Sequence, residues 1–408
     1  MSAPSDRSPA ARRAPPLAGL RVLELGQILA GPFAGALLAY FGADVIKVEP
    51  PGRGDPIRTW RELDDDGTSY WWRSISRNKR CITLDLSRSE GQALARRLIA
   101  GTDVVIENFR PGTMESWGLD PESLRRDHPG LVVARLSGFG QTGPYSHRPG
   151  YASVCEAFGG LRHLTGMPGQ ESVRSNLSLG DSLAGLHAAL GILLALEARR
   201  RDGIGQVVDV AIFESVFNVL ESVVPEFAHG GLVRGPSGPT ISGIVPSNAY
   251  SAADGRKVVI GANNAANFRR LMREIGRPDL AADDELGGNA ARVARQAEID
   301  DAISSWTARR TASEVVAALD RASVPASTEF TVADMFDDPH YRARELFERV
   351  PGAGSEWTVP AMRPRLEETP GETRFAGGEL GAANDEVYRG ELGLDADELA
   401  RLRAGGVI

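Results

Sequence analysis

Short apolar runs alternate with helical patterns through the first third of the chain. An apolar run at 21–25 predicts a strand, a helical pattern follows over 32–41, and a second strand is expected at 45–48. The alternation continues with strands at 82–86, 103–107 and 131–136 and with helices at 89–100 and 121–128. Strands that alternate with helices in this way favour an α/β fold with a parallel, doubly wound sheet and right-handed crossovers.

The longest helical pattern begins at Asp181 and ends near Arg201. Three arginines occupy its last turn, and Gly203 provides a stop signal. The leucines that repeat at helical spacing are Leu186, Leu190, Leu193 and Leu194. The most hydrophobic part, 183–196, is fourteen residues long, whereas a membrane span needs about 20 apolar residues. We therefore expect a soluble protein, in which a strand at 205–211 and a helix at 214–227 follow.

The composition changes after residue 228, where Gly, Pro, Ser and Thr accumulate and predict a linker. A hairpin is expected over 250–262 with its turn at Asp254–Gly255, and it opens a smaller inserted α+β domain. Helices are expected at 267–275, 298–308 and 312–322, with a last one at 395–404. The predicted plan is a disordered lead-in (1–16), the first part of a large Rossmann-like domain (17–228), a linker with a Gly-rich loop (229–249), a small domain (250–349), a return linker (350–370) and the rest of the large domain (371–408).

The overall composition is that of an ordinary globular protein. With 408 residues, 42% hydrophobic and 25% charged, the chain has room for two or three domains and is neither fibrous nor wholly disordered. Its net charge of −8 argues against nucleic acid as the main partner, because that role needs a concentrated basic surface. Cys81 and Cys155 are too few for a disulfide framework and fit a reducing cytoplasm. The six histidines show no metal-binding spacing.

Two short motifs suggest chemistry but fail on their context. Gly138–Gly143 matches the G-x-G-x-x-G of dinucleotide sites, but the prolines that follow argue against the helix which that motif requires. Gly180–Leu183 spells the G-D-S-L sequence of one esterase class, with Ser182 as nucleophile and His340 as its base. Those esterases carry the motif near the N-terminus. A serine esterase therefore stays as an alternative.

Asp181 has two interpretations at the predicted start of the long helix. Asp often caps helices, so it could be a simple N-cap. It could also be a covalent nucleophile, because the positive end of the helix dipole favours the ionised carboxylate, which can attack an activated acyl carbon. Basic residues offer candidate phosphate contacts at Arg110, where Phe109 adds a stacking surface, and in the cluster of Arg77, Lys79 and Arg80. A solvated surface explains these cations equally well.

Several segments together resemble the class III CoA-transferase family, of the CaiB/BaiF type, which includes formyl-CoA transferase. They occur in order along nearly the whole chain. The matching segments are Val22–Leu25, Ala30–Pro32, Gly42–Glu49, Asn78–Arg80, Leu84–Leu86, Glu107–Gly112, Ser137–Pro144, Gly180–Asp181, Gly205–Gln206 and Gly405–Ile408.

The resemblance implies transfer of CoA from an acyl-CoA to a carboxylic acid, with Asp181 forming first a mixed anhydride and then an aspartyl-CoA thioester. It also implies an interlocked homodimer, no metal and no prosthetic group. The glycine-rich loop that closes over the intermediates would contain Gly235, Gly238 and Gly243. The CoA contacts fall on Leu29, Ala30, Leu84, Asp85, Leu86, Ser87, Arg88, Asn108, Phe109, Arg110, Arg148 and Tyr151. The run 244–250 resembles members that use succinyl-CoA as donor and short dicarboxylates as acceptors.

The chain departs from the family pattern where the CoA phosphates bind. Pro50 and Ser116 stand where formyl-CoA transferase has arginines, and Ser87 stands where lysine is common. The candidates to replace these cations are Arg88, Arg110 and Arg148.

The same fold hosts α-methylacyl-CoA racemases, which use an aspartate and a histidine as opposed bases. The position of that histidine is Tyr151 in this chain. Because a tyrosine with a pKa near 10 is a poor base at neutral pH, the substitution favours transfer and leaves racemisation as the alternative.

Overall fold

The computed structural model of the chain describes residues 13–352 and 356–408. The first twelve residues of the predicted lead-in and part of the predicted return linker lie outside the described residues. The described chain forms two compact units. The first comprises the residues up to Leu161, Ser175–Ser222 and Ala343–Ile408, and the second comprises Arg162–Arg174 and Val223–Arg342. The second unit thus begins before the predicted small domain and includes the predicted linker, 229–249.

The first unit is built on a six-stranded sheet in which every strand pairing is parallel. The strand order is β3-β2-β1-β4-β5-β6, which is the order of doubly wound nucleotide-binding folds. The predicted mixed α/β fold with a parallel sheet is therefore confirmed. The strands are β1 (Arg21–Glu24), β2 (Asp44–Glu49), β3 (Lys79–Thr83), β4 (Val104–Glu107), β5 (Val132–Ser137) and β6 (Val207–Ala211).

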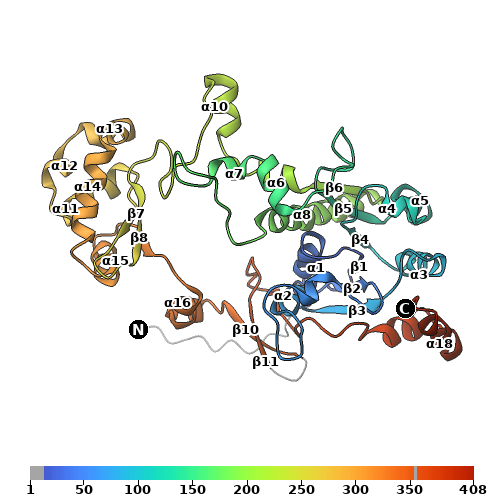
Figure 1. Cartoon of the computed structure of the whole chain (residues 1–408). Coiled ribbons are helices and arrows are strands. Elements are labelled where there is room, and N and C mark those ends of the chain that lie inside the picture. Colours follow the sequence, from blue (N-terminus) through green and yellow to red (C-terminus); the bar gives the residue numbers. More distant parts are fainter. Residues whose placement is uncertain (1–12, 353–355) are drawn as a thin grey trace. The chain divides into compact units, whose positions relative to one another are not determined.

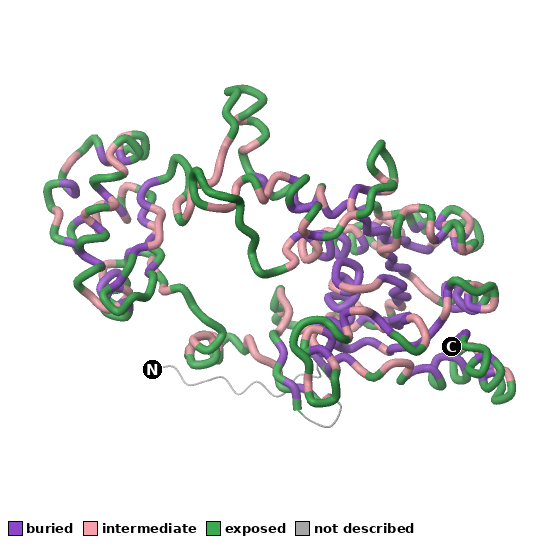
Figure 2. The backbone as a smooth tube through the Cα atoms, viewed as in Figure 1, coloured by how far each residue is buried: buried purple, intermediate pink, exposed green. Residues whose placement is uncertain are grey.

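Both faces of this sheet are buried from β1 to β5, so side chains on either face of these strands pack into a core. On β1, Val22 packs into the cluster that contains α1 and α8, and Leu23 packs into the cluster that contains α3 and α18. Figure 1 shows these helix pairs on opposite sides of the sheet, and Figure 2 shows the buried backbone along the strands. The helices and remaining strands of this part are α1 (Ala30–Tyr40), η1 (Pro56–Thr59), α2 (Tyr70–Ile75), α3 (Ser89–Ala100), α4 (Thr113–Ser116), α5 (Pro121–Asp127), α6 (Ala152–Phe158), α8 (Leu179–Asp202), α9 (Ile212–Phe217), β10 (Phe347–Pro351), β11 (Glu356–Pro360), the π-helix η3 (Glu386–Glu391) and α18 (Ala396–Ala404).

Helix α8 is the long helix that the leucine pattern predicts. It has 24 residues and ends at Gly203 in the left-handed conformation, as a glycine stop should. By length and composition alone, α8 could cross a membrane. Its buried alanines, among them Ala184 and Ala188, pack in the same core cluster as α1 and the sheet. We therefore assign α8 to the core of the first unit.

The second unit contains an antiparallel sheet of order β7-β8-β9 and a set of helices around one core. The predicted hairpin is confirmed, since β7 and β8 pair antiparallel and Ser251 faces Lys257 across the turn at Asp254–Gly255. The elements are β7 (Ser247–Ser251), β8 (Lys257–Gly261), β9 (Ala326–Thr328), α10 (Val223–Gly230), α11 (Ala265–Glu274), α12 (Pro278–Ala282), η2 (Glu285–Gly287), α13 (Asn289–Ala294), α14 (Gln296–Thr307), α15 (Ala312–Arg321) and α16 (Val332–Asp337). Two short helices, α7 (Leu161–Leu164) and α17 (Pro339–Ala343), occur where the chain passes between the units.

One predicted helix is wrong. The segment 214–227 is not a single helix, because α9 ends at Phe217 and α10 begins only at Val223. Between them Glu221 has a φ of 52°, a left-handed conformation that an α-helix cannot include. The predicted linker is also shorter than its composition suggests, since α10 continues to Gly230 and β7 starts at Ser247.

Candidate active site

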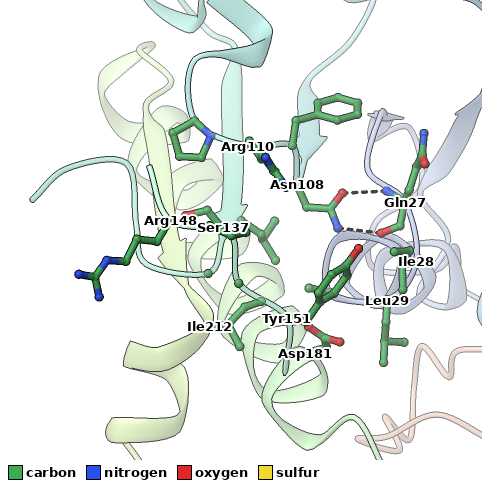
Figure 3. Close-up of a pocket in the computed structure, with 17 residues that line it drawn as sticks. Gln27, Ile28, Leu29, Asn108, Arg110, Ser137, Arg148, Tyr151, Asp181 and Ile212 are labelled. Carbon is green, nitrogen blue, oxygen red and sulfur yellow. Dashed lines mark hydrogen bonds between the residues drawn. The ribbon is translucent and has the colours of Figure 1, made fainter. Parts of the chain in front are cut away.

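The chain reverses its direction of winding between β1 and β4, which are neighbours in the sheet. In open α/β sheets, ligands bind at the carboxyl ends of the strands at such a switch point. A hollow of about 220 Å³ lies there, lined entirely by residues of the first unit (Figure 3). Its walls are Gln27–Ala30 after β1, Asn108–Pro111 after β4, Leu136–Gly138 at the end of β5, Arg148–Tyr151, Asp181 and Ile212.

Asp181 lies in the first turn of α8 and forms part of the wall of this hollow. The residue before it is held closely, because the Gly180 N–H donates to Glu156 Oε1 at 3.0 Å. A Cβ at position 180 would come within 3.1 Å of Ile212 and 3.3 Å of Glu156. The absence of a side chain at Gly180 thus lets the start of α8 approach α9 and α6 closely, and the side chain of the next residue, Asp181, reaches the hollow.

Cys155, on α6, is a second nucleophilic side chain close enough to Asp181 for the charge of that carboxylate to affect it. Its thiol is fully buried and contacts the Gly138 carbonyl at 3.3 Å. Burial raises the pKa of the Cys155 thiol to about 12, and the negative charges of Asp181 and Glu156 add to the effect. Since the thiolate is the reactive form, Cys155 is inert at neutral pH and Asp181 is the better candidate nucleophile.

Eight of the sequence-predicted residues line this hollow. Arg148 stacks on Tyr145, with its guanidinium carbon 3.6 Å from the ring centroid, and its side chain extends away from Asp181 in Figure 3. Both amide atoms of the Asn108 side chain bond the backbone of Gln27, at 2.7 Å each. Asn108 therefore shapes the wall through Gln27. The eight are Leu29, Ala30, Asn108, Phe109, Arg110, Arg148, Tyr151 and Asp181.

A second hollow of about 110 Å³ lies beside the first, and Gln27 and Phe109 line both. Four predicted CoA contacts form one of its walls, namely Leu84, Asp85, Leu86 and Ser87. They lie in a loop, because β3 ends at Thr83 and the strand predicted at 82–86 is displaced toward the N-terminus. Phe109 and Trp117 contact each other edge to face, with ring centroids 4.9 Å apart. Arg53 is the cation in its lining, and among the described residues no carboxylate pairs with it. The two hollows together suit a long ligand with a reactive end at Asp181 and an anionic end near Arg53.

Other predicted residues lie elsewhere. Arg88 is not in either lining and donates to the Gly405 carbonyl. Gly235, Gly238 and Gly243 belong to the second unit, where the Gly238 N–H donates to the Gly166 carbonyl at 2.9 Å. Pro50 lines the second hollow.

The esterase nucleophile has no support from the geometry. The Ser182 hydroxyl donates to the Ser178 carbonyl at 3.1 Å, inside its own helix, and Ser182 is absent from the lining. The Ser116 hydroxyl likewise donates a hydrogen bond to a backbone carbonyl near it in the chain, that of Thr113, at 2.8 Å.

The basic cluster after α2 is a structural feature and not a phosphate site. Lys79 is fully buried, and its ammonium lies 2.8 Å from the Glu24 carboxylate. Arg77 is also buried, and its guanidinium donates a hydrogen bond to the Pro360 carbonyl at 2.6 Å. Arg80 pairs with Asp44. Both expectations from the sequence are therefore wrong for Arg77 and Lys79, which are neither solvated at the surface nor available to a phosphate.

Sequence reasoning missed Gln27, Ile28, Arg53, Trp117 and Ile212, which all line one of the hollows. Three of them could have been found, because Gln27 and Ile28 follow β1 and Arg53 follows β2, and strand ends of one sheet edge converge. In the part of the chain that the structure describes, no group of three or more His, Cys, Asp or Glu side chains could hold a metal ion.

Comparison with known proteins gives one consistent result. The model of CoA-transferase family III matches residues 17–384. The succinyl-CoA–D-citramalate CoA-transferase of Chloroflexus aurantiacus is 48% identical over 395 residues, covering 96% of this chain and 98% of the relative. The succinate–glutarate CoA-transferase of Agrobacterium fabrum is 36% identical, covering 86% and 89%. A crystal structure of a CaiB/BaiF family protein from Brucella suis matches with a TM-score of 0.82 and 35% identity, covering 93% and 100%.

Proposed function

Because the chain belongs to CoA-transferase family III, we propose that it moves CoA from succinyl-CoA to a short dicarboxylic acid by way of Asp181. The enzyme is a CoA-transferase of class EC 2.8.3, and it acts on an acyl-CoA and a carboxylic acid. Relatives named for citramalate, glutarate and mesaconate share succinate or succinyl-CoA as the partner, which supports the proposed donor. The position of Asp181 in the hollow at the switch point is the observation that carries the proposal.

The proposed chemistry needs no redox step and conserves the thioester. The Asp181 carboxylate attacks the thioester carbonyl of succinyl-CoA, the C–S bond breaks, and CoA thiolate leaves a succinyl-aspartyl anhydride. The thiolate then attacks the aspartyl carbonyl of that anhydride, succinate departs, and Asp181 carries CoA as a thioester. The acceptor carboxylate attacks this thioester and releases thiolate, which finally attacks the acceptor acyl carbon and frees Asp181.

Each of these steps passes through a tetrahedral oxyanion and is vulnerable to water. Backbone N–H groups that face the oxyanion lower the barrier, and exclusion of water preserves the anhydride and the thioester. For the closing element we propose the glycine-rich segment with Gly235, Gly238 and Gly243. Its positive φ values at Gly238 and Gly243, 64° and 75°, give a backbone that side chains rarely permit.

The phosphates of CoA require cations away from the thioester. We propose that Arg53 in the second hollow supplies one of them, in place of the missing arginine at Pro50. Arg110 and Arg148 at the first hollow add positive charge, and for both the structure gives no carboxylate partner among the residues it describes. Phe109 and Trp117 offer aromatic surface to the base of the same nucleotide.

We further propose a cytoplasmic homodimer. The leucines that face away from the core on α8 form an exposed apolar stripe, with Leu190 and Leu194 55% and 62% exposed. A stripe of this kind on a core helix is typical of a protein–protein contact, and a second copy of the chain is the proposed occupant. Both cysteines are free thiols, which is consistent with the reducing cytoplasm.

The test is a mass-spectrometric exchange assay with succinyl-CoA and a panel of short mono- and dicarboxylic acids. Asp181→Ala should abolish exchange, whereas the neighbouring control Ser182→Ala should keep at least half of it. Enzyme denatured during turnover should yield a peptide that carries CoA on Asp181. Full exchange by Asp181→Ala would refute the mechanism. Incorporation of deuterium at the α-carbon of an acyl-CoA, without exchange of acids, would favour the racemase.

A further inference from the structure

The backbone after β1 is held in a conformation that its sequence does not favour. Ile28 has a φ of 68°. The left-handed region is costly for any residue with a Cβ and is an outlier for a β-branched one. Ile28 lies in the wall of the first hollow, between Gln27 and Leu29. A strained residue at this position persists only if the surrounding structure compensates its cost.

Partners from three other segments supply that compensation. The Ile28 N–H donates to both carboxylate oxygens of Asp55, at 3.0 Å each. The Gly26 carbonyl accepts from the Lys47 ammonium, and the Gln27 N–H and carbonyl bond the Asn108 side chain (Figure 3). The Gly26 carbonyl, both backbone polar groups of Gln27 and the Ile28 N–H therefore each have a side-chain partner.

Asp55 has the most demanding position among these partners. It is 1% exposed, with Lys47 at 2.8 Å and the Ile57 N–H at 3.1 Å. Its own N–H donates to Glu49 at 2.9 Å. Although burial opposes ionisation, the Lys47 ammonium and the backbone donors keep the pKa of Asp55 below its usual value. A buried ion pair is a costly way to stabilise a protein, since apolar residues of equal volume often do as well.

We propose that Asp55 is a positioning residue for the transfer reaction, which fixes Ile28 in its left-handed conformation and so aims Gln27–Ala30 at the hollow of Asp181. This inference rests on the proposed function. Leu29 is the N-cap of α1 and has no side-chain cap bond, so the contacts that hold the backbone just before α1 are those of Gly26, Gln27 and Ile28. If Ile28 relaxes to a negative φ, the wall opposite Asp181 changes course. The ion pair with Lys47 then serves to hold one backbone N–H.

The decisive experiment tests whether Ile28→Gly restores the kcat that is lost when Asp55 is replaced. Glycine adopts positive φ without the Cβ penalty, so Ile28→Gly removes the strain that Asp55 opposes. Asp55→Asn should lower kcat about 100-fold, the size expected for a displacement of about 1 Å at a reacting centre. The double variant Asp55→Asn/Ile28→Gly should regain at least about 10-fold of that loss, with Ile28→Gly alone as its reference because that variant lacks one side chain of the hollow's lining.

A purely structural role predicts a different pattern. The double variant would then be as inactive as Asp55→Asn, and that result, or a full kcat in folded Asp55→Asn, overturns the proposal. Asp44→Asn is the matched control, because Asp44 is on β2 like Lys47 and pairs with Arg80 far from the loop. It should leave kcat unchanged.

Thermal unfolding and calorimetric binding of CoA distinguish an effect of these variants on folding from an effect on function. Thermal unfolding should show both Asp55 variants equally destabilised, so that rescue of kcat is not rescue of stability. If Asp55→Asn does not fold, Asp55→Ser, with and without Ile28→Gly, provides the same comparison. Calorimetric binding of CoA should follow the same order of variants as kcat. If wild type binds CoA but exchanges no acid, the proposed function fails while the binding order still tests the role of Asp55.

Discussion

The Glu156 carboxylate of α6 accepts a hydrogen bond from the backbone N–H of Gly180, at 3.0 Å. This bond joins two helices one residue before the candidate nucleophile. The N-cap of α8, Ser178, makes no side-chain cap bond, so a carboxylate from another helix caps the first turn instead. Glu156 is 1% exposed, so this hydrogen bond is buried.

Replacing Glu156 should therefore affect both stability and turnover. Glu156→Leu leaves the Gly180 N–H buried without its acceptor and should cost about 1.5–3 kcal/mol in the free energy of unfolding. It should also lower kcat more than it raises KM, because the first turn of α8 loses its position. Glu156→Gln keeps an oxygen acceptor and should retain most of both quantities. Urea unfolding and steady-state kinetics measure them, and equal kcat in Glu156→Leu and wild type would contradict the prediction.

Arg53 should matter only for substrates that carry phosphates. Arg53→Ala removes a charge-assisted bond to phosphate and should raise KM for succinyl-CoA about 10-fold or more. The KM for succinyl-pantetheine, which lacks the nucleotide, should not change. Arg200→Ala is the control, since Arg200 is a surface cation paired with Glu197 in the last turn of α8. An equal rise in KM for both thioesters would place Arg53 outside the phosphate subsite.

The parallel sheet could be predicted because short apolar runs alternate with helical patterns along the first third of the chain. The end of α8 at Gly203 and the turn at Asp254–Gly255 are examples in which one glycine decides the backbone. The position of Asp181 at a helix start was equally readable. The pattern does not reveal the chemical role of the residues around Asp181. That expectation came from the resemblance to the CoA-transferase family.

Long-range contacts of polar residues could not be predicted. Lys47 and Lys79 stand in strands where the pattern suggests solvent, yet both are fully buried and pair with Glu24. The bond between Asp55 and Ile28 joins residues that no periodicity connects, and a left-handed isoleucine is contrary to local propensity. These contacts depend on strand order, which brings the ends of β1, β2 and β3 together.

The last residues of the chain support the second hollow. The Asp85 N–H donates to the Val407 carbonyl at 2.8 Å, and Val407 is 1% exposed in the core cluster below α18. Val407→Ala should cost about 2 kcal/mol in the free energy of unfolding through the lost methyl groups. It should also raise KM for succinyl-CoA, because the loop with Asp85 and Ser87 loses its support. A loss of stability without any change in KM would show that the tail does not position this loop.

Glu107, the last residue of β4, links folding stability to pH. Its carboxylate accepts from the Phe109 N–H at 2.8 Å and from Arg135 at 2.7 Å. Burial raises the pKa of Glu107 to about 7, from an ordinary value of 4.5, even though Arg135 opposes the change. The folded protein therefore binds this proton more tightly than the unfolded chain does. The stability that it contributes is fully present below pH 4.5 and is lost as the pH rises through 7.

Glu107→Gln should remove this part of the pH dependence, because the amide does not titrate. Between pH 5 and pH 8 the unfolding free energy of wild type should fall relative to that of Glu107→Gln, by at most about 3 kcal/mol. Comparing slopes rather than absolute values cancels the constant cost of the lost ion pair with Arg135. Glu122→Gln, at an exposed position on α5, is the matched control and should run parallel to wild type. Denaturant titrations at each pH measure the difference, and parallel lines for wild type and Glu107→Gln would mean that Glu107 is ionised throughout this range.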